Sequence, residues 1–164
     1  MFDGCEIAVW ALLVGASFTD LRWGKIPNAL TFPFLAVGLG YRFTLGGRQG
    51  FESLIAVFIA FALFFPLYRL RAFAAADVKL LMAVGAWTDP RTVLGIGVMA
   101  ILIGAGVGAF ILWRQIGIRE SFSTVIAHMG RGQIRRSHKM PFAPAFLCGF
   151  VFLKIAESYR WSII

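Results

Sequence analysis

Apolar residues occur in six long runs along the chain, separated by short polar or basic segments. The runs cover residues 7–21, 29–45, 53–68, 72–88, 92–113 and 144–159. A helix needs about 20 predominantly apolar residues to cross a bilayer, and several runs are shorter, so their boundaries are approximate. We interpret each run as one membrane helix. This pattern predicts an all-α integral membrane protein, a single domain of six transmembrane helices over residues 1–164.

The composition supports a membrane location. Of the 164 residues, 59% are hydrophobic and 15% are charged, and the mean hydropathy is +0.79. Soluble domains have about 45–50% apolar and about 25% charged residues. A chain of this length cannot bury such an apolar excess inside a globule, because small domains have too much surface. We therefore expect membrane lipid to cover much of the protein.

The basic residues predict the orientation in the membrane. A net charge of +8 would suggest nucleic acid as a partner of a soluble protein. Here the bases are concentrated between apolar runs, so we attribute them to topology and expect no nucleic-acid partner. With the N-terminus outside, eleven of the 16 Lys and Arg residues lie in inner segments, six of them in the basic segment 114–140. The positive-inside rule therefore predicts that both termini are outside.

Two further features concern the fifth run and the segment after it. The run is rich in glycine, which allows helices to approach closely in lipid. These glycines are Gly95, Gly97, Gly104, Gly106 and Gly108. The cytoplasmic segment 114–140 mixes basic and apolar residues, which suits either an amphipathic helix on the inner leaflet or an irregular basic loop.

Two carboxylates, Asp20 and Asp77, lie within the apolar runs. Ionisable groups inside a membrane segment are costly and usually mark function. Asp20 lies near the inner end of the first run. Asp77 follows Arg71 by six residues, which is about 9 Å along a helix. Both acids are therefore predicted at a similar depth near the cytoplasmic face, and inverting the whole topology would keep them together.

A pair of carboxyl groups can catalyse peptide hydrolysis. When two such groups share one site, they can hold one proton between them, so that one acts as a base while the other acts as an acid. The base takes a proton from a water molecule that attacks the peptide carbonyl, and the acid polarises that carbonyl. Spacing alone leaves another interpretation open, in which Asp20 pairs with Arg22 and Asp77 pairs with Lys79 at the membrane interface.

Three short strings resemble landmarks of the type IV prepilin peptidase family of GxGD-type aspartyl proteases. They are DLRWGKIPN at 20–28, ADVKLLMAVG at 76–85 and KMPFAPA at 139–145, and they occur in the family's order. The resemblance implies that Asp20 and Asp77 are the two catalytic acids of an aspartic-type endopeptidase. It also implies that the substrate is a prepilin, cleaved at its leader on the cytoplasmic side of a bacterial inner membrane, without a metal or other cofactor.

The chain departs from the family pattern in two ways. Ala74 and Ala76 replace both glycines of GxGD, which reduces the freedom of the backbone beside Asp77. The chain also lacks the cytoplasmic insert with paired CxxC motifs that the long family members carry. It instead resembles the short forms associated with Flp (tight-adherence) pili, so we do not expect it to methylate the new pilin N-terminus.

The remaining candidates for contact with the leader or with lipid phosphate are basic. They are Arg22, Lys25, Lys79 and Lys139. Pilus assembly machinery is an expected partner. Two alternatives to a protease remain open. One is a catalytically silent scaffold of a pilus or secretion machine, suggested by the alanines before Asp77. The other is a small ion-coupled transporter that uses Asp20 and Asp77 as proton or cation sites.

Overall fold

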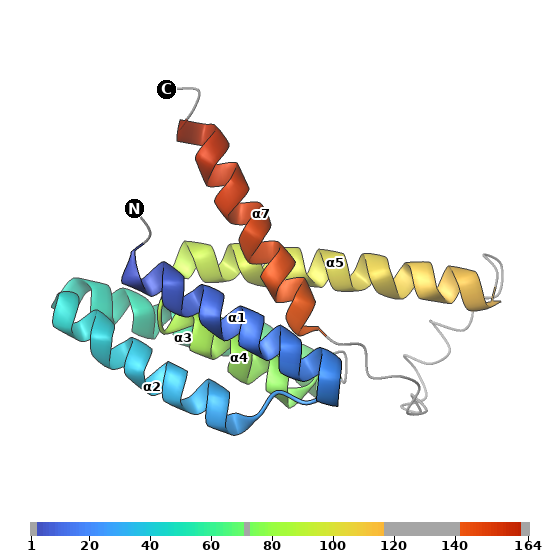
Figure 1. Ribbon diagram of the computed structural model, residues 1–164, viewed down its shortest axis with the longest axis horizontal. Helices are drawn as coiled ribbons and strands as arrows, with labels where there is room; N and C mark the ends of the chain where they lie inside the picture. Colours follow the sequence, from blue (N-terminus) through green and yellow to red (C-terminus); the bar gives the residue numbers. More distant parts are fainter. Residues whose placement is uncertain (1–2, 71–72, 117–141, 162–164) are drawn as a thin grey trace.

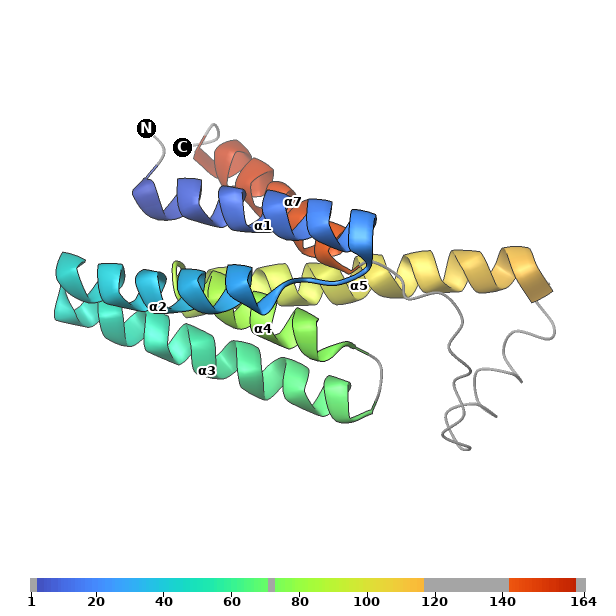
Figure 2. The same cartoon turned by 60° about the horizontal axis from the view of Figure 1, so that its bottom comes forward.

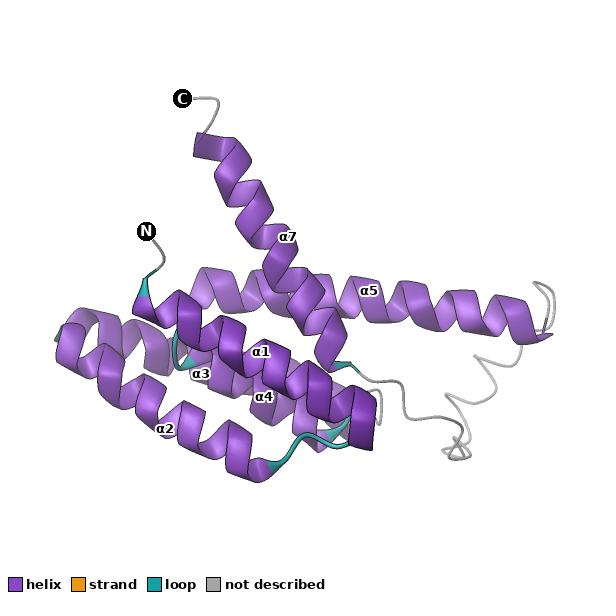
Figure 3. Cartoon of the chain, in the orientation of Figure 1, coloured by secondary structure: helices purple, strands orange, loops and turns teal. Residues whose placement is uncertain are grey.

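The computed structural model describes residues 3–70, 73–116 and 142–161, and the regular structure of this part of the chain is helical (Figures 1 and 3). Its helices correspond in order to the six predicted apolar runs. They are α1 (Gly4–Trp23), α2 (Asn28–Leu45), α3 (Gly47–Arg69), α4 (Ala75–Gly85), α5 (Pro90–Ile116) and α7 (Ala143–Trp161).

Three of these helices are long and apolar enough to cross a membrane, judged by length and composition. They are α1, α3 and the stretch Pro90–Val107 of α5, and α7 adds a shorter apolar stretch, Ala143–Ala156. The helix α4 has only 11 residues, about 16 Å at 1.5 Å per residue. A hydrocarbon core is about 30 Å thick. The prediction of an all-helical membrane protein is confirmed, whereas only three of the six predicted spans are clearly apolar enough to cross.

The helices form two groups that α5 connects. The helix α1 lies beside α7, and α2, α3 and α4 pack together on the other side (Figure 2). The helix α5 contacts α7 in the first group and α3 and α4 in the second. The candidate site described below draws one acid from each group.

The distribution of apolar side chains suits a lipid environment. Phe64, Leu81 and Phe146 are fully buried where the helices meet. Large apolar side chains also cover the outer surface, and on α3 Phe51 is 62% and Phe58 is 70% exposed. Exposed apolar surface this extensive marks an interaction site on a soluble protein, whereas here lipid can cover it.

The glycines of α5 allow its neighbours to approach, as predicted. A Cβ atom built on Gly95 would lie 2.8 Å from Leu153 Cδ1, and one on Gly97 would lie 3.1 Å from the Phe64 ring. A Cβ atom on Gly104 would overlap the ring of Phe142. Gly106 differs, because a Cβ atom there would meet nothing within 4 Å. Close packing is therefore confirmed at three of these glycines and not at Gly106, and the surroundings of Gly108 lie outside the described residues.

The basic segment predicted at 114–140 begins later than expected, because α5 continues to Ile116. The rest of that segment lies outside the described residues. The choice between an amphipathic helix and an irregular loop, and the position of Lys139, therefore remain predictions. The same holds for the orientation of the termini.

Candidate active site

Asp20 lies in the last turn of α1. The helix ends at Gly24, whose φ of 59° is left-handed and whose N–H donates to the Asp20 carbonyl oxygen at 2.8 Å. Glycine adopts this conformation without steric cost. The half-buried side chain of Asp20 accepts a hydrogen bond at Oδ2 from the backbone N–H of Ala143, at 3.2 Å. Because Ala143 is the first residue of α7, the start of one helix orients an acid at the end of another.

Asp77 lies in the first turn of α4 and is only 4% exposed. Its Oδ2 accepts a hydrogen bond from the Ala74 N–H, and its own N–H donates to the Ala74 carbonyl, both at 3.0 Å. Ala74 has no side-chain oxygen, so only the acidic half of a capping box is present. A carboxylate is favoured at a helix N-terminus, where backbone N–H groups lack helical partners.

The structure brings the two acids together at one end of the bundle. The helices α1 and α4 contact each other, with Asp20 in the last turn of α1 and Asp77 in the first turn of α4. Each acid also accepts a hydrogen bond from a backbone N–H at the start of a helix. Two carboxyl groups that share one site can hold one proton between them and act as an acid–base pair.

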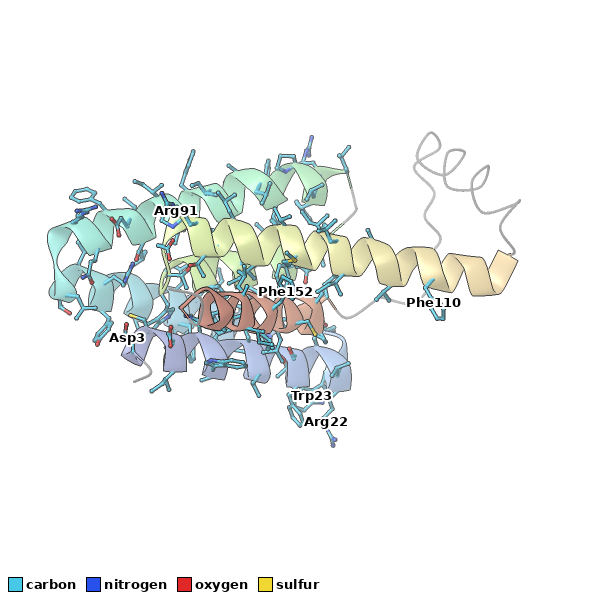
Figure 4. All side chains as sticks on the ribbon, turned by 90° about the horizontal axis from the view of Figure 1, so that it is seen from above. Asp3, Arg22, Trp23, Arg91, Phe110 and Phe152 are labelled. Carbon is cyan, nitrogen blue, oxygen red and sulfur yellow. The ribbon has the colours of Figure 1, made fainter. Side chains whose placement is uncertain are left out.

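The neighbouring bases do not neutralise these acids. Lys79 donates from Nζ to Asn28 Oδ1 at 3.1 Å and lies 5.2 Å from the centroid of the Phe32 ring. Arg22 lies 5.8 Å from the ring centroid of Trp23, and both side chains project from the end of α1 (Figure 4). Within the described chain neither aspartate forms a salt bridge, which argues against the interfacial ion pairs. Lys25 is exposed in the link between α1 and α2.

A cluster of aromatic rings holds the two helix starts together. Phe73, just before α4, packs against Phe142, just before α7, with ring centroids 4.6 Å apart. Phe64 of α3 lies 4.9 Å from Phe73 and 5.6 Å from Phe146 of α7. The cluster thus fixes the segments that supply the N–H donors to both acids. Sequence reasoning missed this contact. The signal for it was present, because Phe142 lies inside the landmark string 139–145 and Phe73 lies shortly before the string 76–85.

Ser17 is a further polar group on the same helix as Asp20, one turn earlier. Its side chain is buried, at 6% exposure. Its hydroxyl has no hydrogen-bond partner among the described residues. Such a group is costly to bury unless a water molecule or a bound ligand satisfies it.

The fold and the site define a helical membrane protein that brings two carboxyl groups together at one end of its bundle. Residues 7–109 match the type IV leader peptidase family. The match covers both aspartates and more than half of the chain, so the protein belongs to this family. Family membership together with the apolar helices supports a protein of the inner membrane.

The relatives carry names that agree with this family. A prepilin leader peptidase/N-methyltransferase of Burkholderia pseudomallei is 26% identical over 160 residues, which is 90% of this chain and 45% of the relative. A protein of the same name from Xanthomonas campestris is 32% identical over 66% of this chain and 40% of the relative. The prepilin peptidase EppA of Methanothermobacter thermautotrophicus is 42% identical over 42% of this chain and 19% of the relative.

The chain therefore spans less than half the length of these relatives. No solved structure matches it.

Proposed function

We propose that this protein is an aspartic-type endopeptidase that removes the leader peptide of type IV prepilins, with Asp20 and Asp77 acting together. The observation that supports it best is the geometry of the two acids. They come from different helix groups, they lie on helices that contact each other, and each carboxylate accepts a backbone hydrogen bond. Family membership supplies the reaction class, and the names of the relatives suggest the substrate.

The chemistry needs only these two groups and one water molecule. The ionised aspartate takes a proton from the water as its oxygen bonds to the scissile carbonyl carbon. The protonated aspartate donates a hydrogen bond to the carbonyl oxygen, which becomes part of a tetrahedral intermediate. When the C–N bond breaks, a proton passes to the leaving amine, and the two products carry a new carboxyl group and a new amino group. The buried hydroxyl of Ser17 lies one turn from Asp20, where a bound water could satisfy it.

We propose that the site opens towards the cytoplasm and that all six helices lie in the membrane, with both termini outside. The excess of basic residues in the inner segments supports this orientation. The helix α4 is too short to span the bilayer alone, and residues 73 and 74 directly before it are not helical. Non-helical backbone at membrane depth is tolerated where it is buried in protein or lines a water-filled space. This suits a hydrolytic site at the start of α4.

The family match does not identify which kind of prepilin is the substrate. We propose a Flp-type prepilin, because the chain resembles the short family members associated with these pili. The exposed bases Arg22 and Lys25 lie beside the site, where lipid phosphate or the leader could contact them. Membrane lipid and pilus assembly machinery are proposed as further partners.

The test is leader cleavage of a purified Flp-type prepilin by this protein in detergent or liposomes. We would compare the wild type with Asp20→Asn and Asp77→Asn, each of which keeps the side-chain shape and removes the ionisable group. Glu52→Gln is a matched control, because Glu52 is an acid that pairs with the exposed Arg48 on α3. Cleavage by the wild type and the control, lost in both aspartate variants, supports the proposal.

A lack of cleavage by the wild type would favour a different function. Intact prepilin with the folded wild type, over several prepilins, would contradict the protease and favour a scaffold. Ala74 and Ala76 at the start of α4 are the observation that motivates this second candidate. In that case, pilus assembly in cells would survive both aspartate substitutions and fail only when the protein is deleted.

A further inference from the structure

A cavity of about 410 Å³ lies at the end of the bundle opposite the aspartates. It opens among the start of α1, the end of α2, the turn between α4 and α5, and α7. Asp20 and Asp77 are near the other ends of α1 and α4, about 20 Å away at 1.5 Å per residue. The cavity is therefore separate from the candidate active site, and the proposed peptidase reaction does not use it.

One wall of the cavity carries a cation, Arg42, that forms no ion pair with any described carboxylate. Arg42 of α2 is half-buried, and its Nε donates to Ser53 Oγ at 2.8 Å. Ser53 in turn donates to the Thr88 carbonyl oxygen at 3.4 Å. Within the described chain no carboxylate pairs with Arg42, so its remaining guanidinium nitrogens have no anion to contact. A partly buried, uncompensated charge is costly, and a planar guanidinium matches a phosphate group well.

The acids that line the cavity differ in their ion pairs and hydrogen bonds. Glu6 of α1 forms an ion pair with Lys154 of α7. Asp89 accepts hydrogen bonds from the N–H groups of Arg91 and Thr92 and from the Thr92 hydroxyl. Asp3, by contrast, is exposed at the start of α1 and makes no side-chain hydrogen bond to the helix. The cavity therefore offers one cation, Arg42, and one anion, Asp3, to a ligand.

This charge pattern excludes a simple anion and suits a zwitterion. Three acids and two bases line the cavity, so a ligand with phosphate charge alone would meet net repulsion. The remaining walls include Val9, Leu45 and Phe150, which are apolar. A polar pocket with apolar walls at the end of a membrane helix bundle lies where lipid headgroups lie.

We propose that this cavity binds the headgroup of a zwitterionic phospholipid, with its phosphate on Arg42 and its ammonium on Asp3. Phosphoethanolamine is a headgroup that carries both a phosphate and an ammonium group. The apolar walls pack against the glycerol region, and the acyl chains pass into the bilayer along the helices. The bound lipid thereby bridges α1 and α2, which belong to the two helix groups.

The test is thermal unfolding of the full chain in detergent while short-chain lipids are titrated in. The lipids are dihexanoyl phosphatidylethanolamine, dihexanoyl phosphatidylglycerol and dihexanoylglycerol, which has no phosphate. Inorganic phosphate is the soluble probe. We expect phosphatidylethanolamine to raise the Tm saturably, because a ligand that binds the folded state stabilises it. Phosphatidylglycerol should bind more weakly, and the other two should have no effect.

Variants assign the contacts. Arg42→Gln should weaken phosphatidylethanolamine binding by about tenfold or more, the loss expected for a hydrogen bond to a charged group. Arg48→Gln is the matched control, because Arg48 is exposed at the same end of the bundle and outside the cavity. Ser53→Ala removes the hydrogen bond to Arg42 but keeps the guanidinium, and should retain binding. Asp3→Asn should reduce the preference for phosphatidylethanolamine over phosphatidylglycerol.

Several results would overturn the proposal. Equal binding of phosphatidylglycerol and phosphatidylethanolamine by the wild type would exclude a zwitterion site, and an equal shift with inorganic phosphate would exclude a lipid site. Unchanged phosphatidylethanolamine binding in Arg42→Gln would exclude this cavity. Lipid binding is measured without prepilin cleavage, so its failure is distinguishable from failure of the proposed peptidase.

Discussion

Replacing Gly104 by alanine should disturb the candidate active site from outside it. A methyl group there would lie closer than 3.0 Å to Cε1 of Phe142 and 3.2 Å from Cδ1. Phe142 cannot move freely, because its ring packs against Phe73. The next residue, Ala143, donates the hydrogen bond that orients Asp20. The new methyl group should therefore displace both the aromatic cluster and this donor.

The magnitude follows from two opposing effects. Inserting a methyl group into a packed core costs about 1–3 kcal/mol. Alanine is favoured over glycine inside a helix by about 1 kcal/mol. Gly104→Ala should therefore destabilise the protein by about 0–2 kcal/mol. Gly106→Ala, two residues along α5, meets no atom within 4 Å and should gain up to about 1 kcal/mol. The difference between the unfolding free energies of the two variants therefore measures the cost of overpacking at Gly104.

The effect on cleavage should be larger than the effect on stability. Displacing a catalytic group by about 1 Å can cost about 100-fold in rate. We expect Gly104→Ala to lose at least tenfold in prepilin cleavage at a temperature where it stays folded, and Gly106→Ala to keep wild-type activity. Thermal unfolding and cleavage would be measured on the same preparations. Equal activity and stability of the two variants would refute the reasoning that Phe142 links α5 to Asp20.

Three further substitutions test other contacts. Asp89→Ala should cost about 1 kcal/mol, the usual loss of a helix N-cap, measured by thermal unfolding. Burial raises the pKa of Asp89, but hydrogen bonds from Thr92, from its own backbone and from Arg91 outweigh this and lower it. The contribution should therefore be present at neutral pH and vanish as the pH falls through the folded pKa, and a constant difference down to pH 3 would contradict this. Lys79→Met should keep the cleavage rate within about threefold of the wild type, since Lys79 contacts Asn28 and Phe32 and neither aspartate. A large loss of cleavage that Lys79→Arg does not show would mean that the positive charge acts on the aspartates. Gly38→Ala should destabilise by about 0–2 kcal/mol, the overpacking cost less the helix gain, because its Cβ would lie 2.6 Å from Trp87 Nε1. Gly40→Ala, with open space around it, should not destabilise the protein, and chemical denaturation would compare the two variants.

The sequence predicts the helices better than it predicts the membrane spans. Hydrophobic runs give the order and number of helices in the described chain, because each run ends at a polar or glycine-containing link such as 24–27. The same runs do not show that α4 begins only at Ala75, since residues 72–88 are apolar on both sides of that point. Hydropathy measures transfer into lipid, and it does not report where the backbone turns.

The acids were predictable, and the groups that orient them were not. Asp20 and Asp77 stand out because a charge inside an apolar run needs a reason. Their similar depth in the membrane is a prediction from helix direction alone. The Ala143 N–H, in contrast, meets Asp20 across 123 residues of chain, and every non-proline residue has such a donor. Proximity in sequence left open an ion pair of Lys79 with Asp77, whereas the Lys79 side chain donates to Asn28.

The placement of the two acids connects their relative position to the packing of the two helix groups. Three contacts join α1 to α7 along their length: Glu6 with Lys154, Trp10 with Phe150, and Asp20 with Ala143. Asp20 therefore moves with the pair formed by α1 and α7.

Asp77 belongs to the other group, because α4 packs against α2 and α3. The two groups meet near the acids through α5 and through the contact of Phe73 with Phe142. A shift of α7 relative to α3 would then move Asp20 relative to Asp77. Packing at this contact therefore bears on the spacing of the two acids, which is why a methyl group on α5 should alter the proposed cleavage without touching either aspartate.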